Sequence, residues 1–159
     1  MTVGRPLGLE ISPRMTGKTT RLIAKAKEHL AKGDLVRVVC SSGHQDYFSK
    51  QIPGALVRSH RQQFPANLDP EEGVWFYDEF EWLANAQHRA NAYYYSSPRF
   101  TRKIGCDAGS DLLLQLLYAN EGRFERHYWC ADMSECLEEA RLSYAPDEFR
   151  RLFLGEFFE

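Results

Sequence analysis

The chain has 159 residues, of which 43% are hydrophobic and 13% aromatic, so it has the length and apolar content of about one folded domain. Its formal net charge of −2 excludes a strongly basic nucleic-acid-binding domain, and any DNA contact must come from a local patch. No apolar stretch long enough for a membrane span, no secretory leader and no zinc-type cysteine spacing is seen, so we expect a cytoplasmic protein with reduced thiols and no membrane partner.

The first predicted elements follow the order strand, helix, strand. An apolar run at 7–11 predicts a strand, and apolar residues at helical spacing predict a helix over 18–32 that Gly33 ends. The apolar run 35–40 lacks strict alternation, which is typical of a parallel strand buried on both faces. Together these segments form a βαβ unit.

The rest of the chain continues the alternation of strands and helices. Residues 55–58, 74–77 and 93–95 are expected to be strands, 124–130 an exposed edge strand, 62–73 a loop, and 80–92 and 111–118 helices. Residues 145–159 are expected to close the chain as an amphipathic helix that packs Phe149, Leu152 and Phe153 on the core. We therefore expect an α/β fold, a three-layer sandwich around a mostly parallel central sheet, as a single domain over 1–159.

A phosphate-binding loop is predicted between the first strand and the first helix. The sequence S-P-R-M-T-G-K-T at 12–19 matches the pattern G-x-x-x-x-G-K-[ST] except at its first position, where serine matters only if a positive φ is required. In this P-loop NTPase fold, backbone N–H groups surround a polyphosphate, Lys18 reaches its β and γ phosphates, and Thr19 holds Mg²⁺. The expected nucleotide-binding residues are Ser12, Pro13, Arg14, Met15, Thr16, Gly17, Lys18, Thr19 and Thr20. The alternative is a chance Gly-Lys-Thr at a helix start, where threonine would only cap the helix.

Two adjacent carboxylates follow the apolar run 74–77. Asp78 is expected to hold the Mg²⁺ shell with Thr19, and Glu79 to activate the water that attacks the γ phosphate. Such a run also ends many ordinary surface strands, but its pairing with the loop makes a shared site the better interpretation. Adjacent Asp and Glu favour NTPases that use water attack, such as helicases, AAA+ machines and packaging motors.

Three segments resemble the large-terminase ATPases that drive viral DNA packaging. R-M-T-G-K-T-T at 14–20 is similar to their R-Q-x-G-K-[ST]-T loop, and Y-Y-Y-S-S-P-R at 93–99 is similar to their coupling motif. The carboxyl segment 145–157 is similar to the P-x-x-F-x-R-E-x-L-G-E-F segment that closes their ATPase domain. The resemblance implies that Arg14 acts in cis on the phosphates, and that Ser96 and Ser97 sense the γ phosphate.

The resemblance also implies an ATPase with ATP and Mg²⁺ as cofactors, in the host cytoplasm if the protein is viral. Double-stranded DNA would be bound by a local basic cluster, Arg99, Arg102 and Lys103, and the protein would work in a homo-oligomeric ring or beside other packaging proteins. Only eleven residues precede the loop, so the glutamine with which the family reads adenine has no counterpart. The aspartates of the family's nuclease are also missing, and no nuclease activity is expected.

Two rival interpretations remain. In the first, the chain is a reduced P-loop binding module that acts as a regulator of another phage or host protein, or as a decoy for it. In the second, it is another small NTPase, such as a replication accessory ATPase. The histidines show no metal or catalytic spacing and are interpreted as surface residues. The tyrosines at 93–95 are interpreted as strand packing rather than as a base-stacking platform.

Overall fold

Five parallel strands form the centre of the computed structural model, which describes residues 4–129 and 131–159. They are β1 (Gly8–Ile11), β2 (Val36–Cys40), β3 (Leu56–Ser59), β4 (Val74–Asp78) and β5 (Ala92–Ser96). Their order in the sheet is β1-β5-β4-β2-β3, and each neighbouring pair is parallel. The predicted parallel sheet is therefore confirmed, and all five predicted positions from 7–11 to 93–95 hold strands.

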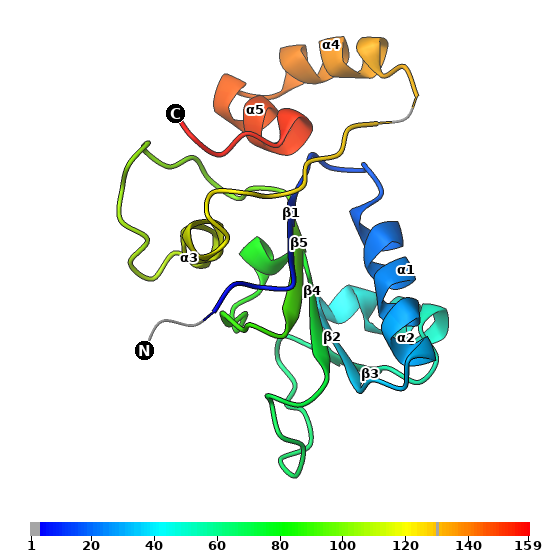
Figure 1. Cartoon of the computed structure of the whole chain (residues 1–159). Coiled ribbons are helices and arrows are strands. Elements are labelled where there is room, and N and C mark those ends of the chain that lie inside the picture. Colours follow the sequence, from blue (N-terminus) through cyan, green and yellow to red (C-terminus); the bar gives the residue numbers. More distant parts are fainter. Residues whose placement is uncertain (1–3, 130) are drawn as a thin grey trace.

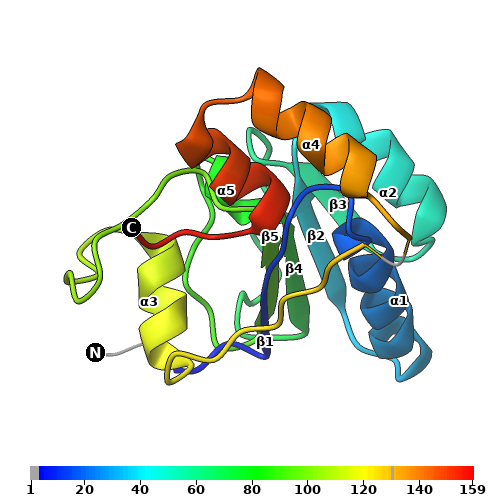
Figure 2. The same cartoon turned by 90° about the horizontal axis from the view of Figure 1, so that it is seen from above.

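Helices lie on both faces of this sheet. They are α1 (Lys18–Ala31), α2 (Gln45–Gln51), α3 (Leu112–Ala119), α4 (Ser134–Ser143) and α5 (Pro146–Leu154), with short 3-10 turns η1 (Ser42–His44) and η2 (Phe80–Trp82). Figures 1 and 2 show α1 and α2 against one face, α3 on the other, and α5 beyond the carboxyl end of β1. This arrangement is consistent with a three-layer sandwich. No helix in the described part of the chain is long and apolar enough to cross a membrane.

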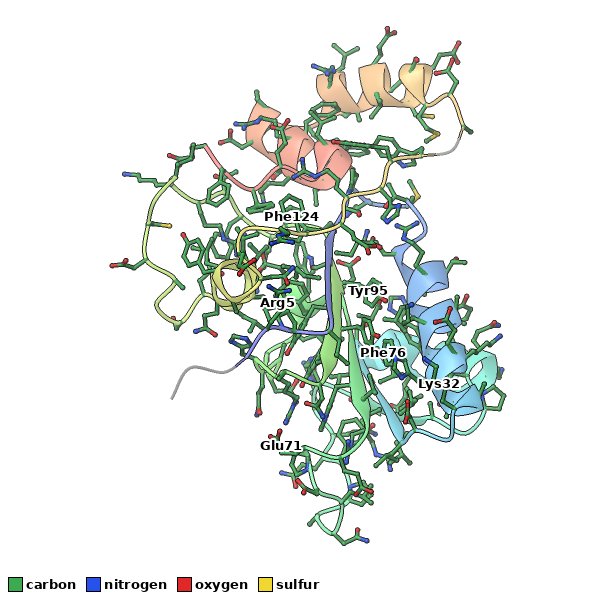
Figure 3. All side chains as sticks on the ribbon, viewed as in Figure 1. Arg5, Lys32, Glu71, Phe76, Tyr95 and Phe124 are labelled. Atoms are coloured by element: carbon green, nitrogen blue, oxygen red, sulfur yellow. The ribbon has the colours of Figure 1, made fainter. Side chains whose placement is uncertain are left out.

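Successive strand residues alternate between two apolar cores. Val38, Phe76 and Tyr95 pack with Leu22 and Ala26 of α1. A neighbour of each of these strand residues faces the opposite side, where Val39, Tyr77 and Tyr94 pack with the leucines of α3. In Figure 3, Phe76 and Tyr95 lie on the side of the sheet that faces α1. Because both faces are buried, β4 and β5 are apolar almost throughout rather than alternating, up to the polar residues at their carboxyl ends.

The helix predicted over 80–92 is wrong. Only the turn η2 forms there, after which Leu83 is extended, and β5 already begins at Ala92. Tertiary contacts hold the segment in an irregular path, since the Tyr94 hydroxyl bonds the Gln87 carbonyl and the Arg89 N–H. The Arg89 guanidinium also stacks on Trp75, 4.0 Å from the ring centroid. These contacts outweigh the helical propensity of the segment.

The segment predicted as an edge strand over 124–130 lies beside β1 but forms only one bridge among its described residues, between Glu125 and Glu10. Ile11 donates to the Glu125 carbonyl and Glu125 donates to the Leu9 carbonyl, both at 2.9 Å. Cys130 lies outside the described residues. The segment thus lies at the edge of the sheet, as predicted, but it does not form the predicted strand.

The carboxyl-terminal helix is confirmed as α5, but it ends at Leu154 rather than at 159, because Gly155 adopts the left-handed conformation. It buries Phe149 and Leu152, while Phe153 is only half-buried and stacks on Phe149. Helices α2 and α4 are not predicted by the sequence pattern. Both are short or largely exposed, so neither has the apolar stripe from which a helix is predicted.

Candidate functional site

A loop joins the end of β1 to the start of α1. Gly17 ends this loop in the left-handed conformation with φ 89°, and α1 begins at the next residue without a side-chain cap. Met15 is the other left-handed position, with φ 55°, so the serine at position 12 is not at a point that requires glycine. The positive end of the α1 dipole therefore faces the loop, as an anion site requires.

The loop is held together by its own side chains. Thr16 Oγ1 and Lys18 Nζ both donate to the Pro13 carbonyl, at 2.9 and 2.8 Å. Arg21 donates to the Thr16 carbonyl at 2.8 Å. Lys18 is nearly buried, with 6% of its surface exposed, and its ammonium lies 3.4 Å from a carboxylate oxygen of Glu79. The loop lysine is thus directed toward the acidic end of β4.

Asp78 is the last residue of β4 and faces the first turn of α1. Its carboxylate accepts a hydrogen bond from Thr19 Oγ1 at 3.4 Å. Burial, followed by the nearby charge of Glu79, raises the pKa of Asp78 to about 7. A hydroxyl and a carboxylate oxygen are ligands that suit Mg²⁺, which favours oxygen donors and keeps several waters. Thr19 and Asp78, the two residues predicted to share a metal, are therefore neighbours in space.

Glu79 follows Asp78 and adopts a left-handed backbone conformation, φ 51°, which is uncommon for a residue other than glycine. One carboxylate oxygen accepts from the Ser97 N–H at 3.1 Å and from Ser97 Oγ at 3.2 Å. Ser96 Oγ lies 3.3 Å from the same oxygen. With Lys18 on its other oxygen, Glu79 is held between the loop and the end of β5.

Strand order explains how the two serines reach this position. Because β5 lies between β1 and β4 in the sheet, its carboxyl end comes between the loop and the acidic pair. Ile11 pairs with Ser96 in the register, and the Ser12 N–H donates to the Ser96 carbonyl at 3.1 Å. The residues predicted as sensors therefore contact Glu79 directly.

Arg14 is tied to the rest of the protein by its main chain. Its N–H donates to the Leu152 carbonyl of α5 at 2.8 Å, and its carbonyl accepts from Trp129 Nε1 at 3.0 Å. Its exposed side chain borders a hollow of about 350 Å³ that Lys18, Asp78, Glu79 and Ser97 also line. We call this hollow the acidic hollow. It collects predicted residues from the loop, from β4 and from β5.

The remaining loop residues have other surroundings. Ser12 and Pro13 are buried beneath the loop, and Ser12 Oγ accepts from the His127 N–H at 3.0 Å. Thr16, Gly17 and Thr20 line a second hollow, on the side of α1. The predicted nucleotide-binding residues thus divide between the interior and two hollows.

Sequence reasoning missed several residues around the loop. Ser41 and His44, which follow β2, line the acidic hollow, and no local pattern marks them. Glu10 lies within β1 and is only 2% exposed. Its carboxylate forms a bidentate ion pair with Arg21, which donates from Nε at 2.7 Å and from Nη2 at 2.9 Å. A glutamate inside an apolar strand is the signal that could reveal this pair, because a buried charge needs a partner.

Glu10 also belongs to the group of acids and histidine that could hold a metal among the described residues. Its carboxylate, Glu125 and His127 offer ligand atoms within 4.8 Å of one another. Arg21 already neutralises Glu10, so the group differs in place and chemistry from the predicted pair of Thr19 and Asp78. His29 corrects the interpretation of the histidines as surface residues, because it is largely buried and contacts Asp34 and Tyr93.

The predicted basic cluster is not a continuous surface. Arg102 is only 5% exposed, and its guanidinium lies 2.7 Å from Glu81 and 2.8 Å from Asp111. It is an internal ion-pair residue, whereas Arg99 and Lys103 remain exposed. The sequence predicts that Arg102 belongs to a local basic cluster for DNA, but two carboxylates from separate segments hold it inside the protein.

Comparison with known proteins identifies no relative of the chain. No family model, no curated protein and no solved structure matches the chain. The residues of the site are therefore the basis on which a function can be proposed.

Proposed function

We propose that the chain is a Mg²⁺-dependent ATPase whose phosphate site is the loop 12–20. The observation that carries the proposal is the meeting of Thr19 with Asp78 and of Lys18 with Glu79 at the end of a parallel sheet. These contacts join residues far apart in the sequence that were expected, on chemical grounds, to share one site. A chance Gly-Lys-Thr at a helix start does not require an acidic pair at this place.

Each of the predicted phosphate, metal and base residues has a distinct task in the proposed reaction. Lys18 and Arg14 bind the phosphates and balance the negative charge that spreads over the transferring group. Thr19 and Asp78 would hold Mg²⁺, which supplies further charge neutralisation to the β and γ oxygens when it is bound. Glu79 orients a water molecule and accepts its proton as the water attacks the γ phosphorus; the bond to the bridging oxygen breaks, and ADP leaves with that oxygen.

Lys18 and the serines prepare Glu79 for this task. In the present arrangement the Lys18 ammonium lies between the Pro13 carbonyl and Glu79, so a phosphate that enters the loop would compete for it. The Ser97 N–H and hydroxyl hold the other carboxylate oxygen. A change at the γ phosphate would therefore reach β5 through Glu79, which is the role expected of Ser96 and Ser97.

We further propose that this ATPase serves viral DNA packaging, like the large terminases that its motifs resemble. Supporting this, all three resembling segments meet at one place: Arg14 is in the loop, Ser96 and Ser97 contact Glu79, and Leu152 of α5 accepts from Arg14. A single-domain motor would act as a ring or with partner proteins, and the exposed cations Arg99 and Lys103 follow the coupling serines in the chain.

One observation favours a second candidate, a P-loop binding module that docks on another protein. With Arg102 internal and a net charge of −2, the basic surface expected for a DNA motor is reduced to two side chains of the proposed cluster. A binding module would keep the loop and the nucleotide but would not need DNA.

A steady-state ATPase assay with and without double-stranded DNA separates the candidates. Turnover that requires Mg²⁺ and rises with DNA supports the motor. Nucleotide binding without turnover, under all DNA conditions, supports the binding module. If the protein binds no nucleotide at all, both candidates are wrong.

A further inference from the structure

A second hollow adjoins the phosphate loop on the side of α1. It measures about 630 Å³ and is lined by Gly17 and Thr20 of the loop and helix, and by Tyr128, Trp129 and Met133 of the segment that leads to α4. Met15 borders both this hollow and the acidic hollow. A ligand bound over the loop can therefore extend from one hollow into the other. We call the second one the aromatic hollow.

The aromatic wall is attached to the loop rather than loosely placed beside it. Trp129 Nε1 donates to the Arg14 carbonyl, and the His127 N–H donates to Ser12 Oγ, both at 3.0 Å. The rings of Tyr128 and Trp129 are 6.5 Å apart and inclined by 49°. The wall and the loop thus form one unit, in which aromatic surface stands next to the phosphate site.

The exposed apolar side chains and the charges around the aromatic hollow indicate a ligand with an apolar part and an anionic part. Met15 is 79% and Tyr128 55% exposed, so large apolar side chains face solvent on both sides of the hollow. Among the described residues no Asp or Glu lines it, and its ionisable lining residues include Arg21 and His127. A flat, uncharged aromatic group attached to an anionic tail matches this combination.

We infer that the aromatic hollow binds the base of the nucleotide, and that a purine is the base it takes. The inference rests on the proposed function, because the loop 12–20 must hold the phosphates for the base to reach the hollow. Stacking on aromatic side chains does not depend on the base's hydrogen-bonding groups, but it becomes stronger as the π surface of the base grows. Purines should therefore stack more strongly than pyrimidines.

Calorimetry with four probes tests the inference: ATP, GTP, CTP and inorganic tripolyphosphate, each with Mg²⁺. We expect ATP and GTP to bind about tenfold more tightly than tripolyphosphate, with CTP in between. Tyr128→Ala should remove most of this advantage while tripolyphosphate affinity stays unchanged. Tyr118→Ala, at a similarly exposed tyrosine on α3, is the matched control and should change neither.

A second pair of variants separates stacking from support of the loop. Trp129→Phe keeps an aromatic ring and loses the bond to the Arg14 carbonyl, whereas Trp129→Ala loses both. If the ring stacks on the base, only the alanine variant brings ATP down to the affinity of tripolyphosphate. If Trp129 merely supports the loop, both variants weaken ATP and tripolyphosphate alike, and the inference is overturned.

The outcomes for the two proposals are distinct. Equal binding of all four probes by the wild-type protein overturns the base site and leaves the phosphate site standing. Absence of binding by every probe overturns the phosphate site and the base site together. Tighter binding of CTP than of ATP contradicts the purine preference.

Discussion

The backbone N–H of Arg14 donates a hydrogen bond to the carbonyl of Leu152, 2.8 Å away, and so joins the phosphate loop to the last helix of the chain. The contact is reinforced just beyond α5, where Gly155 is in the left-handed conformation with φ 69°. A Cβ on Gly155 would lie 3.0 Å from the backbone nitrogen of Pro13. The carboxyl-terminal segment is therefore a support of the loop, although it contributes no side chain to the acidic hollow among the described residues.

Gly155→Ala should both destabilise the fold and weaken nucleotide binding. The left-handed backbone alone costs a residue with a Cβ about 1–2 kcal/mol, and the close approach to Pro13 adds a displacement of the loop. Gly105→Ala is the matched control, because Gly105 has φ 81° but a Cβ there would meet no described atom within 4 Å. Urea denaturation and calorimetry with Mg²⁺–ATP measure the two effects.

The comparison of Gly155 with Gly105 tests whether the contact of Gly155 with Pro13 supports nucleotide binding. We expect both variants to lose stability, and only Gly155→Ala to lose ATP affinity in the fraction that stays folded. Equal losses in stability together with unchanged ATP affinity in both would show that α5 does not support the loop.

Arg102→Leu should be strongly destabilising. It removes the partner of two carboxylates, Glu81 and Asp111, and removal of one member of a buried ion pair typically costs about 3–5 kcal/mol. Burial raises the pKa of Glu81 even with Arg102 present, so loss of the guanidinium will disfavour the charged carboxylate further. The control Lys103→Leu changes a neighbouring exposed cation and should stay within about 0.5 kcal/mol of wild type.

Variants of the two exposed cations test the DNA contact. If Arg102 is structural, Arg99→Ala and Lys103→Ala should lower DNA stimulation of the ATPase at unchanged stability. Stability equal to wild type in Arg102→Leu, measured by urea denaturation, would place Arg102 back among the surface cations.

Local patterns predicted the strands and the loop well, for physical reasons. Apolar runs such as 35–40 and 74–77 have few alternatives to a buried parallel strand, and Gly17-Lys18-Thr19 at a helix start restricts the backbone strongly. Because the carboxyl ends of parallel strands share one edge of the sheet, Asp78 could be expected near Thr19 from sequence alone.

Features that depend on distant residues could not be predicted. The path after η2 follows from bonds of the Tyr94 hydroxyl, and the burial of Arg102 follows from Glu81 and Asp111. Neither relation leaves a periodic signal, since the partners come from separate segments. The aromatic hollow likewise exists only because residues 127–129 follow a segment that lies beside β1.

Lys18→Ala should remove most of the affinity for Mg²⁺–ATP. The Lys18 ammonium is the cation of the loop pattern that already lies against Glu79, and loss of a charge-assisted hydrogen bond worth about 1.5–3 kcal/mol lowers affinity roughly tenfold to a hundredfold. Lys25→Ala is the control on the same helix, because Lys25 is partly exposed and pairs with Glu28 on the helix surface. Unchanged ATP affinity in a folded Lys18→Ala protein would refute the assignment of the loop.

Glu79→Gln decides between a motor and a passive binder. The amide keeps the shape of the side chain and the Cβ that its left-handed backbone already tolerates, but it cannot accept the proton of an attacking water. We expect ATP affinity within a few-fold of wild type, and hydrolysis lower by roughly 10²–10⁴-fold, the usual effect of removing a positioned base. Glu71→Gln, at an exposed glutamate far from the loop, should leave both unchanged. Single-turnover hydrolysis and calorimetry on the same preparations give the two numbers. If Glu79→Gln hydrolyses ATP at the wild-type rate, Glu79 serves only to hold Lys18 and Ser97 in place, and water must be activated elsewhere.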